Sequence, residues 1–573
     1  MYIEIVPNRN SPPAILLREG RREGKRIHKR TLANLSDWPE QRIEVFRRLL
    51  RDEPLVSPDD LFSTERTLSH GHVEAILGTI RKLGLDNVIA SKRSRERDLV
   101  VAMIAERLIH PCSKLATTRQ WHTTTLSEEL AIEDANEDDL YGAMDWLLER
   151  KERIEKKLGK RHLAEGSIVL YDVSSSYYEG RTCPLARFGH DRDGQKGLPI
   201  IVYGVLTDDQ GCPVAVQTYP GNTGDSTTVV DQVENLRKQF GLTRVVLVGD
   251  RGMLTRPQID KIKEQPGIGW ITALTSVAIR GLLAKGYLQL SLFDKTNLAE
   301  ITSPDYPGER LMACYNPLLC EERGRKRLEL LESTDKALAK IAKEVARRTK
   351  KPMTESEIGF KVGKILGRYK MGKHYNYTIR NGEFQWARCE TSIEQETKLD
   401  GIYVIRTSES KELLSAEDTV RTYKSLSQVE RVFRCLKGID LLVRPIRHRT
   451  QTRVPAHIFL CMLAYYIEWH MRRALAPILF EDEELLTDRK RRDPILPAKP
   501  SESVKKKKRS HKTVDGLPVH SFDTLMAELA ARSRVTYRLK SDESGSTFKQ
   551  VPAPTPLQAK AYELLGLFPV KGN

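Results

Sequence analysis

The segment VVLVGDRGM, residues 245–253, runs four apolar residues directly into Gly-Asp-Arg-Gly. A short apolar run that glycine terminates is typical of a buried strand. This predicted strand leads straight into Asp250. The segment SIVLYDVSSSYYEG, residues 167–180, repeats the pattern, because the apolar run 168–171 leads into Asp172. Two predicted buried strands therefore each deliver one carboxylate.

The segments around these strands predict an α/β fold. Further strands are expected at 200–206 and 214–218, and an amphipathic helix follows with apolar residues at helical spacing between 229 and 240. Three meandering strands, a crossover helix and a parallel strand form the order of a ribonuclease-H-like domain. In that order the first and fourth strands are neighbours, so we expect Asp172 and Asp250 to lie close together. We assign residues 165–269 to the first part of this core.

A third carboxylate is expected from residues 419–475, the second part of the core. Val429, Phe433 and Leu436 form an apolar stripe at helical spacing. Tyr423, Glu430 and Lys437 are seven residues apart, which places them together on another face of the same predicted helix. The apolar run 458–467 predicts a buried helix that closes the core.

Two aspartates and one glutamate supply the oxygen ligands that Mg²⁺ prefers in proteins. Two divalent ions about 3.5–4 Å apart can stabilise both the attacking and the leaving oxygen when a phosphodiester bond is cleaved. Asp225 and Glu179 are competing carboxylates. Capping of the following helix explains Asp225 more simply than a metal role does, and Glu179 is compatible with an exposed strand end.

The remaining segments divide by composition. Residues 1–70 predict a short, β-rich, basic segment. Residues 71–164 predict a helical region whose basic surfaces suit a DNA-binding region, although helical bundles also serve many other roles. Residues 270–418 are expected to interrupt the core as a separate insertion lobe with a long basic helix. Residues 476–573, with blocks of opposite charge, predict a mobile linker and a C-terminal helical tail, with a last helix near 521–535.

Charge and cysteine usage restrict the class of protein. The net charge is +17, from 94 basic and 77 acidic residues, which favours a polyanionic partner such as nucleic acid. The eight cysteines occur singly, without a Cys-x-x-Cys pair, which excludes a zinc ribbon and a disulfide scaffold. The N-terminal residues lack the layout of a signal peptide, and the longest apolar run is too short to span a bilayer. We expect a cytoplasmic protein with reduced thiols.

Taken together, several segments resemble the DDE transposases of bacterial insertion sequences, in the group with a Tyr-x2-Arg-x3-Glu-x6-Lys signature. They are YDVSSSYYEG, LPIIVYGVLTDDQGCPVAVQTYPGNTGDS, VVLVGDRGM, DGIYVIRTS, YKSLSQVERVFRCLKG, RPIRHRT and VPAHIFLCMLAYYIE. The resemblance covers residues 165–470 and implies that Asp172, Asp250 and Glu430 are the catalytic, metal-binding triad. It also implies DNA contacts by Tyr423 and Lys437.

One position departs from that group, because Leu426 stands where the signature has arginine. Lys424, Arg431 and Arg434 lie nearby, and we expect Arg431 and Arg434 to contact nucleic acid.

The resemblance further implies the reaction and its partners. A member of the group binds the terminal inverted repeats of its own element as a homodimer on DNA, cleaves with two Mg²⁺ ions, for which Mn²⁺ can substitute, and joins the 3′ ends to target DNA. This implies a bacterial protein that associates with the nucleoid when bound to DNA. Two alternatives remain: a metal-dependent nuclease without strand transfer, and a catalytically idle DNA-binding protein derived from a transposase. An assay for strand transfer separates the first, and the intact triad argues against the second.

Overall fold

The computed structural model describes residues 1–9, 11–53, 61–380, 382–438, 440–485, 491–540 and 546–567. The chain forms two compact units. The terminal unit holds Met1–Leu68 and Ser533–Ala553, and the main unit holds Ser69–Arg532 and a last segment that begins at Pro554. In the described part of the chain, no helix is both long and apolar enough to cross a membrane.

The terminal unit contains two small antiparallel sheets and one helix. The first sheet is a meander of β1 (Tyr2–Val6), β2 (Ala14–Glu23) and β3 (Arg26–Asn34), followed by α1 (Glu40–Leu49). The second sheet has the order β16-β15-β4, with β4 at Phe62–Ser69, β15 at Ser533–Leu539 and β16 at Thr547–Gln550. Residues 19–23 of β2 and residues 26–32 of β3 are exposed and include many basic residues.

The main unit is built around a mixed sheet of eight strands in the order β10-β11-β14-β9-β8-β5-β6-β7. β8 pairs in parallel with β5 and β9, and the other pairs are antiparallel. The strands are β5 (Ser167–Tyr177), β6 (Ile200–Asp208), β7 (Pro213–Pro220), β8 (Val245–Val248), β9 (Ile268–Ala273), β10 (Leu298–Ile301), β11 (Arg310–Tyr315) and β14 (Ile402–Thr407).

Two short helices make the parallel connections of this sheet. The helix α10 (Thr228–Lys238) crosses from β7 to β8, and α11 (Arg256–Lys263) crosses from β8 to β9. All four residues of β8 are buried, as expected for a strand whose two neighbours are both in the sheet. The prediction of an α/β fold is confirmed.

The expectation that 270–418 forms a separate lobe is wrong for its strands. β10, β11 and β14 all belong to the central sheet, and Ile405, Arg406 and Thr407 of β14 pair with β9. Buried apolar residues of these strands, such as Leu311 and Val404, form a second core with α12 (Ser276–Ala284). The strands are only four to six residues long, too short for an apolar period to reveal them.

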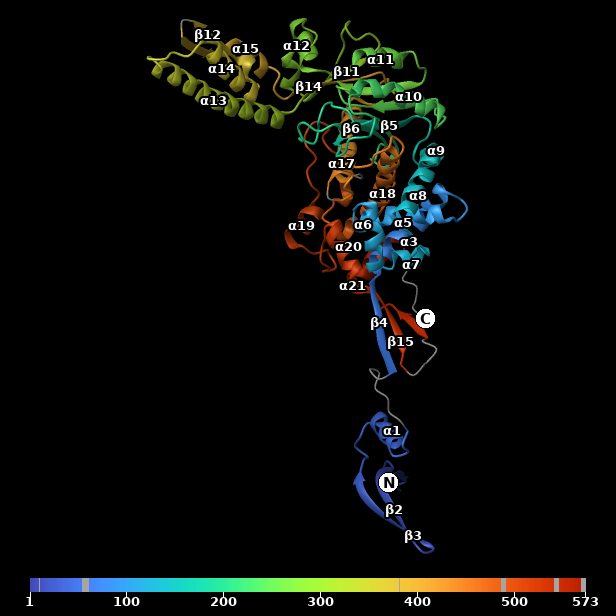
Figure 1. Cartoon of the computed structure of the whole chain (residues 1–573). Coiled ribbons are helices and arrows are strands. Elements are labelled where there is room, and N and C mark those ends of the chain that lie inside the picture. Colours follow the sequence, from blue (N-terminus) through green and yellow to red (C-terminus); the bar gives the residue numbers. More distant parts are fainter. Residues whose placement is uncertain are drawn as a thin grey trace. The chain divides into compact units, whose positions relative to one another are not determined.

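The insertion proper lies between β11 and β14 and has a third hydrophobic core of its own. Its elements lie together in Figure 1 and pack through Leu331, Leu338, Ile358, Val362 and Phe384. They are α13 (Pro317–Arg347), α14 (Glu355–Tyr369), β12 (Tyr375–Arg380), β13 (Glu383–Arg388) and α15 (Glu390–Thr397).

The helical region before β5 shares the largest core with the central sheet. Its longer helices α5 (Arg95–Ile109) and α8 (Glu137–Glu149) pack against α18 (Arg453–Leu475) (Figure 1). The helix α18 is buried along most of its length and also contacts β7. The helices of this region are α3 (Gly71–Leu83), α4 (Leu85–Ile89), α5 (Arg95–Ile109), α6 (Lys114–Gln120), α7 (Leu126–Leu130), α8 (Glu137–Glu149) and α9 (Lys151–His162).

The C-terminal segment also differs from the expected mobile linker. Two of its helices, α20 (Phe522–Ala530) and α21 (Pro556–Leu565), pack on α3 and bury Leu525, Leu529 and Tyr562 in the main core. In α19 (Glu502–Ser510), Lys507 is buried and its Nζ donates to the carbonyls of Ala476 and Glu481, both at 2.8 Å. The high content of charged residues in this segment gave no sign of these buried contacts. Residues 486–490 and 541–545 lie outside the described residues.

Candidate active site

Two of the predicted carboxylates follow paired positions on neighbouring strands. Leu170 of β5 is in register with Val248 of β8, and Asp172 and Asp250 each come two residues later. Because the two strands are parallel, both side chains reach the same end of β8. Asp172 lies inside β5 and not at its end, since the strand continues to Tyr177.

Asp250 is fixed by the turn that follows β8. Its Oδ1 accepts the backbone N–H of Gly252 at 2.9 Å and that of Met253 at 2.8 Å. This turn leaves the second carboxylate oxygen, Oδ2, outside both bonds, and Asp250 is exposed. The Gly-Asp-Arg-Gly sequence thus ends the strand and leaves the carboxylate of Asp250 exposed to solvent.

Glu430 lies on α17 (Leu426–Lys437), which packs on β5. The predicted stripe Val429, Phe433 and Leu436 is buried, and Glu430 is on the exposed side. The expectation of one helix through Tyr423 and Lys437 is wrong. Tyr423 belongs to α16 (Ala416–Lys424), and the helix breaks at Ser425, whose Oγ donates to the carbonyl of Thr422 at 2.6 Å. A serine that bonds to its own backbone competes with the helical pattern.

The three acids act on one another electrostatically. Burial, followed by the charges of Asp250 and Glu430, raises the pKa of Asp172 to about 7, although the N–H of Val173 and the charge of Arg192 oppose the rise. Burial and the same three carboxylates raise the pKa of Tyr423 to about 12, against the charge of Arg251. The structure therefore brings Asp172, Asp250, Glu430 and Tyr423 close enough to affect one another's pKa values, although Asp172 and Glu430 are 258 residues apart in the sequence.

A family model described as a transposase DDE domain matches residues 180–467, just over half of the chain. This chain belongs to the DDE-domain transposases. Asp250 and Glu430 lie inside the matched range, and Asp172 lies eight residues before it. No curated protein matches the sequence. Among solved structures, a cryo-EM structure of piggyBac transposase synaptic complex with hairpin DNA is 9% identical, covers 80% of this chain and 78% of that chain, and has a TM-score of 0.32.

The loop between β5 and β6 contributes two charged residues to the transposase site that the sequence reading missed. Arg192 bonds to Asp225. Asp193 is buried, and its Oδ1 accepts Nζ of Lys437 at 3.0 Å and Nη1 of Arg444 at 2.6 Å. The charges in the loop were visible in the sequence, but nothing in their spacing indicated which helix they would meet.

The four predicted DNA contacts of the transposase therefore differ in availability. Lys437 is held by Asp193, and burial lowers its pKa. Arg431 is held by Glu481 at 2.6 Å. Arg434 is exposed, one helical turn beyond Glu430, and makes no ion pair within the described ranges. Tyr423 stands beside the acids.

The competing carboxylates are each accounted for by a basic partner. Asp225 makes its ion pair with Arg192 and does not cap the following helix. Glu179 accepts from Arg447 at 2.9 Å. Leu426, at the position of the missing arginine, is partly buried against the main core.

Two cavities of the main unit are lined by several basic residues. One, of about 430 Å³, includes Arg251, the neighbour of Asp250, and basic residues of the insertion. The other, of about 230 Å³, is lined by Arg107, Lys114, Arg444, Arg447 and two histidines, and its described lining includes no carboxylate. Lys114 is buried there, and desolvation with the charge of Arg107 lowers its pKa to about 7.

Proposed function

We propose that this transposase cleaves phosphodiester bonds at the ends of its own DNA element and transfers the 3′ ends to target DNA, with Asp172, Asp250 and Glu430 as the metal-binding catalytic acids. The observation that supports this proposal is the electrostatic convergence of the three carboxylates, since the charges of Asp250 and Glu430 both raise the pKa of Asp172. Like charges held together in a fold are costly unless a cation joins them. We also propose that the strand order β7-β6-β5-β8 with the crossover α10 is a ribonuclease-H-like core.

The donor set fits two Mg²⁺ ions, with Mn²⁺ as a substitute, because all three side chains offer carboxylate oxygens. When bound, the ions would stabilise charge on the attacking and leaving oxygens and lower the pKa of a water nucleophile. The turn at Gly252 and Met253 already orients Asp250 through one oxygen, Oδ1, and leaves Oδ2 free of those bonds.

The neighbouring residues supply the remaining polar chemistry. Tyr423 keeps its proton at neutral pH, as an ordinary tyrosine does, and burial and the neighbouring carboxylates raise its pKa further, so its hydroxyl can donate to a phosphate oxygen. Two exposed arginines add positive charge next to the acids along the chain: Arg251 follows Asp250 on the turn after β8, and Arg434 lies one helical turn beyond Glu430 on α17. Lys437 and Asp193 hold the end of α17 against the loop after β5, a positioning role.

DNA is the proposed partner, bound by a homodimer at the terminal inverted repeats. The basic cavity at Arg251 would accept phosphates near the cut, and the cavity at Lys114 a phosphate further along the strand. In the proposed DNA-binding region 71–164, most of α5 is core, but α9 exposes Arg153, Lys156 and Lys160. Binding through such contacts falls steeply with salt.

The test uses a linear duplex from the flanks of the gene that carries matched inverted repeats, with a plasmid as target. We expect Mg²⁺-dependent nicking and joined products, both lost in Asp250→Asn and Glu430→Gln, while gel-shift affinity stays within about twofold. Glu179→Gln is the matched control and should keep both activities. Nicking without joined products would indicate the nuclease alternative, and a shift without either would indicate an idle DNA-binding protein.

A further inference from the structure

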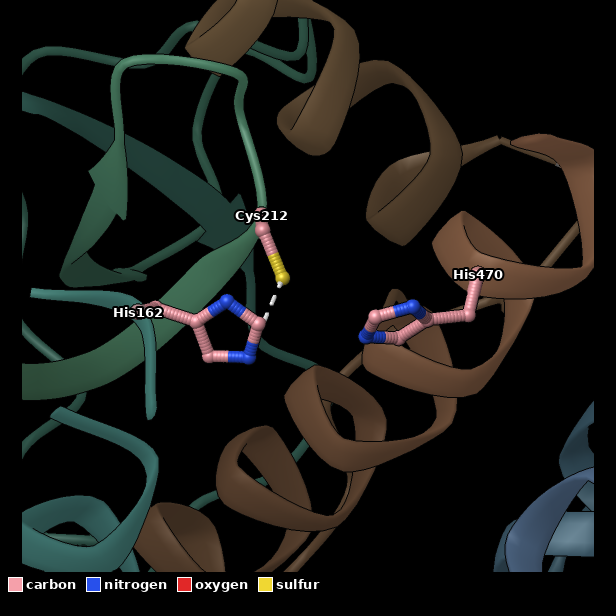
Figure 2. Close-up of side chains that lie close together, drawn as sticks. All are labelled: His162, Cys212 and His470. Atoms are coloured by element: carbon pink, nitrogen blue, oxygen red, sulfur yellow. Dashed lines mark hydrogen bonds between the residues drawn. The ribbon is translucent and has the colours of Figure 1, made fainter. Parts of the chain in front are cut away.

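Three side chains away from the acidic site bring nitrogen and sulfur donors together (Figure 2). His162 is the last residue of α9, Cys212 lies in the turn between β6 and β7, and His470 is on α18. One donor atom from each lies within 4.8 Å of the other two. Cys212 Sγ is 3.9 Å from Nε2 of His162, and the ring of His470 points toward both from the opposite side.

The His470 ring is the member of this cluster that the protein leaves unsatisfied. Its Nε2 is buried and has no hydrogen-bond partner among the described residues. A buried polar atom without a partner costs about 1–3 kcal/mol, so its retention calls for an explanation. A bound metal ion would give this nitrogen a partner. A neutral imidazole is the form that binds a metal.

Cys212 and its turn are held toward the histidines by Asp208. The Oδ1 of Asp208 accepts the backbone N–H of Cys212 at 2.8 Å and that of Gln210 at 2.9 Å. The Oδ2 lies 3.7 Å from Nδ1 of His162, an ion-pair distance that is longer than a hydrogen bond. A carboxylate behind a histidine whose other nitrogen faces the donors is the usual support of a metal-binding histidine.

We propose that His162, Cys212 and His470 bind one Zn²⁺ ion that joins α9, the β6–β7 turn and α18. Two imidazoles and a thiolate suit zinc, with typical bonds of about 2.0–2.3 Å, whereas Mg²⁺ requires oxygen ligands. Tetrahedral bonds of that length place the donor atoms about 3.5 Å apart, so donors that now lie up to 4.8 Å apart must close by about 1 Å on zinc binding. This site is separate from the proposed catalytic acids and does not depend on them.

Two features oppose the ion and make the proposal testable. The hydroxyl of Tyr466 lies 3.0 Å from Nε2 of His162 and must give up that contact or become the fourth ligand. Burial also raises the pKa of the Cys212 thiol, so zinc binding must release its proton. A plain packing cluster, with His162 bonded to Tyr466 and Cys212 as a neutral thiol, is the competing explanation.

The experiment measures metal in the purified full-length chain by elemental mass spectrometry after dialysis against zinc-free buffer. We expect about one zinc per chain in the wild type and less than a tenth of that in Cys212→Ser and His470→Gln. Cys183→Ser, which removes another buried thiol outside the cluster, should keep its zinc. Cobalt in place of zinc should give a thiolate-to-cobalt charge-transfer band that Cys212→Ser lacks.

His470→Cys separates a lost ligand from a lost fold, because cysteine is itself a zinc ligand. This variant should retain zinc where His470→Gln loses it. Zinc well below one per chain in the wild type, or equal zinc in Cys212→Ser, would overturn the proposal and leave the packing cluster. None of these measurements uses DNA, so their outcome is independent of the transposition assay.

Discussion

Two carboxylates of the main unit, the part-buried Asp172 and the buried Glu468, share a raised pKa but differ in their charged neighbours. Asp172 and Glu468 both reach about 7, and in both cases burial is the largest cause. Asp172, however, faces two further acids, whereas Glu468 accepts Nε of Arg472 at 2.5 Å. Arg472 also reaches Glu481 and Asp440, so a protein cation already occupies that group of acids. The raised pKa of either carboxyl group therefore reflects mainly its burial. The place for an external cation is indicated by the two further acids beside Asp172, Asp250 and Glu430.

The largest expected effect is on cleavage when that external cation loses a ligand. Asp172→Asn keeps the size of the side chain and removes a carboxylate oxygen. We expect cleavage to fall by at least about 10³-fold, since metal-assisted charge stabilisation contributes several kcal/mol. The matched variant Glu468→Gln should cleave within about threefold of the wild type at a temperature where both are folded. Rates of Mg²⁺-dependent nicking check this, and equal losses in both variants would show that the two acids do not differ.

The second effect is on stability and runs in the opposite direction. Glu468→Gln leaves the guanidinium of Arg472 with its weaker partners, and we expect a loss of about 1–3 kcal/mol in the free energy of unfolding. Asp172→Asn removes a charge that its neighbours repel, so in metal-free buffer it should unfold at the same or a higher urea concentration. Urea titrations followed by circular dichroism measure both. A destabilised Asp172→Asn would mean that Arg192 compensates the charge more fully than the other acids oppose it.

The third effect is the dependence of stability on pH. A carboxyl whose pKa rises from 3.8 to about 7 on folding binds more protons when folded, so metal-free stability should fall as pH rises from about 4 to 7 and level off above 7. Both Asp172 and Glu468 contribute to that fall. Mg²⁺ should reduce the contribution of Asp172 alone. The slope of melting temperature against pH, with and without Mg²⁺, should therefore differ in the wild type and coincide in Asp172→Asn.

The sequence predicted the part of the site that local patterns encode. Apolar runs that stop at Asp172 and Asp250 specify neighbouring parallel strands, and the stripe through Val429 specifies the buried face of the helix that carries Glu430. The break at Ser425 was not visible, because the residues on both sides are compatible with one helix. Strands β10, β11 and β14 were missed because tertiary pairing with β9 stabilises them more than any local period.

Contacts between distant segments explain the other omissions. The pairing of Asp193 with Lys437 depends on how a loop folds over a helix 244 residues later. His162, Cys212 and His470 come from three segments, so the absence of a Cys-x-x-Cys motif gave no information about them. In the C-terminal segment, Pro, Ser and charge blocks suggested a linker. The structure instead buries Leu525 and Tyr562 almost completely, as it does the core residues of the sheet.

The smallest expected effect concerns Leu426, where the related group has arginine. Leu426 begins α17, four residues before Glu430, and is partly buried against the main core. In Leu426→Arg the stem can keep part of the apolar contact while the guanidinium reaches solvent, so we expect a loss of only about 1 kcal/mol in the free energy of unfolding. A fully buried guanidinium would cost several kcal/mol.

The same substitution should strengthen DNA binding slightly, because it adds a cation on the side of α17 that carries Glu430 and Arg434. We expect the salt dependence of binding to steepen by about one phosphate contact. Leu426→Met, which keeps the apolar contact without charge, is the control and should leave both properties unchanged. Melting curves and gel shifts at several salt concentrations decide the matter. A large loss of stability without tighter binding would place Leu426 in the core and assign the role of the missing arginine to Arg434 or Arg251.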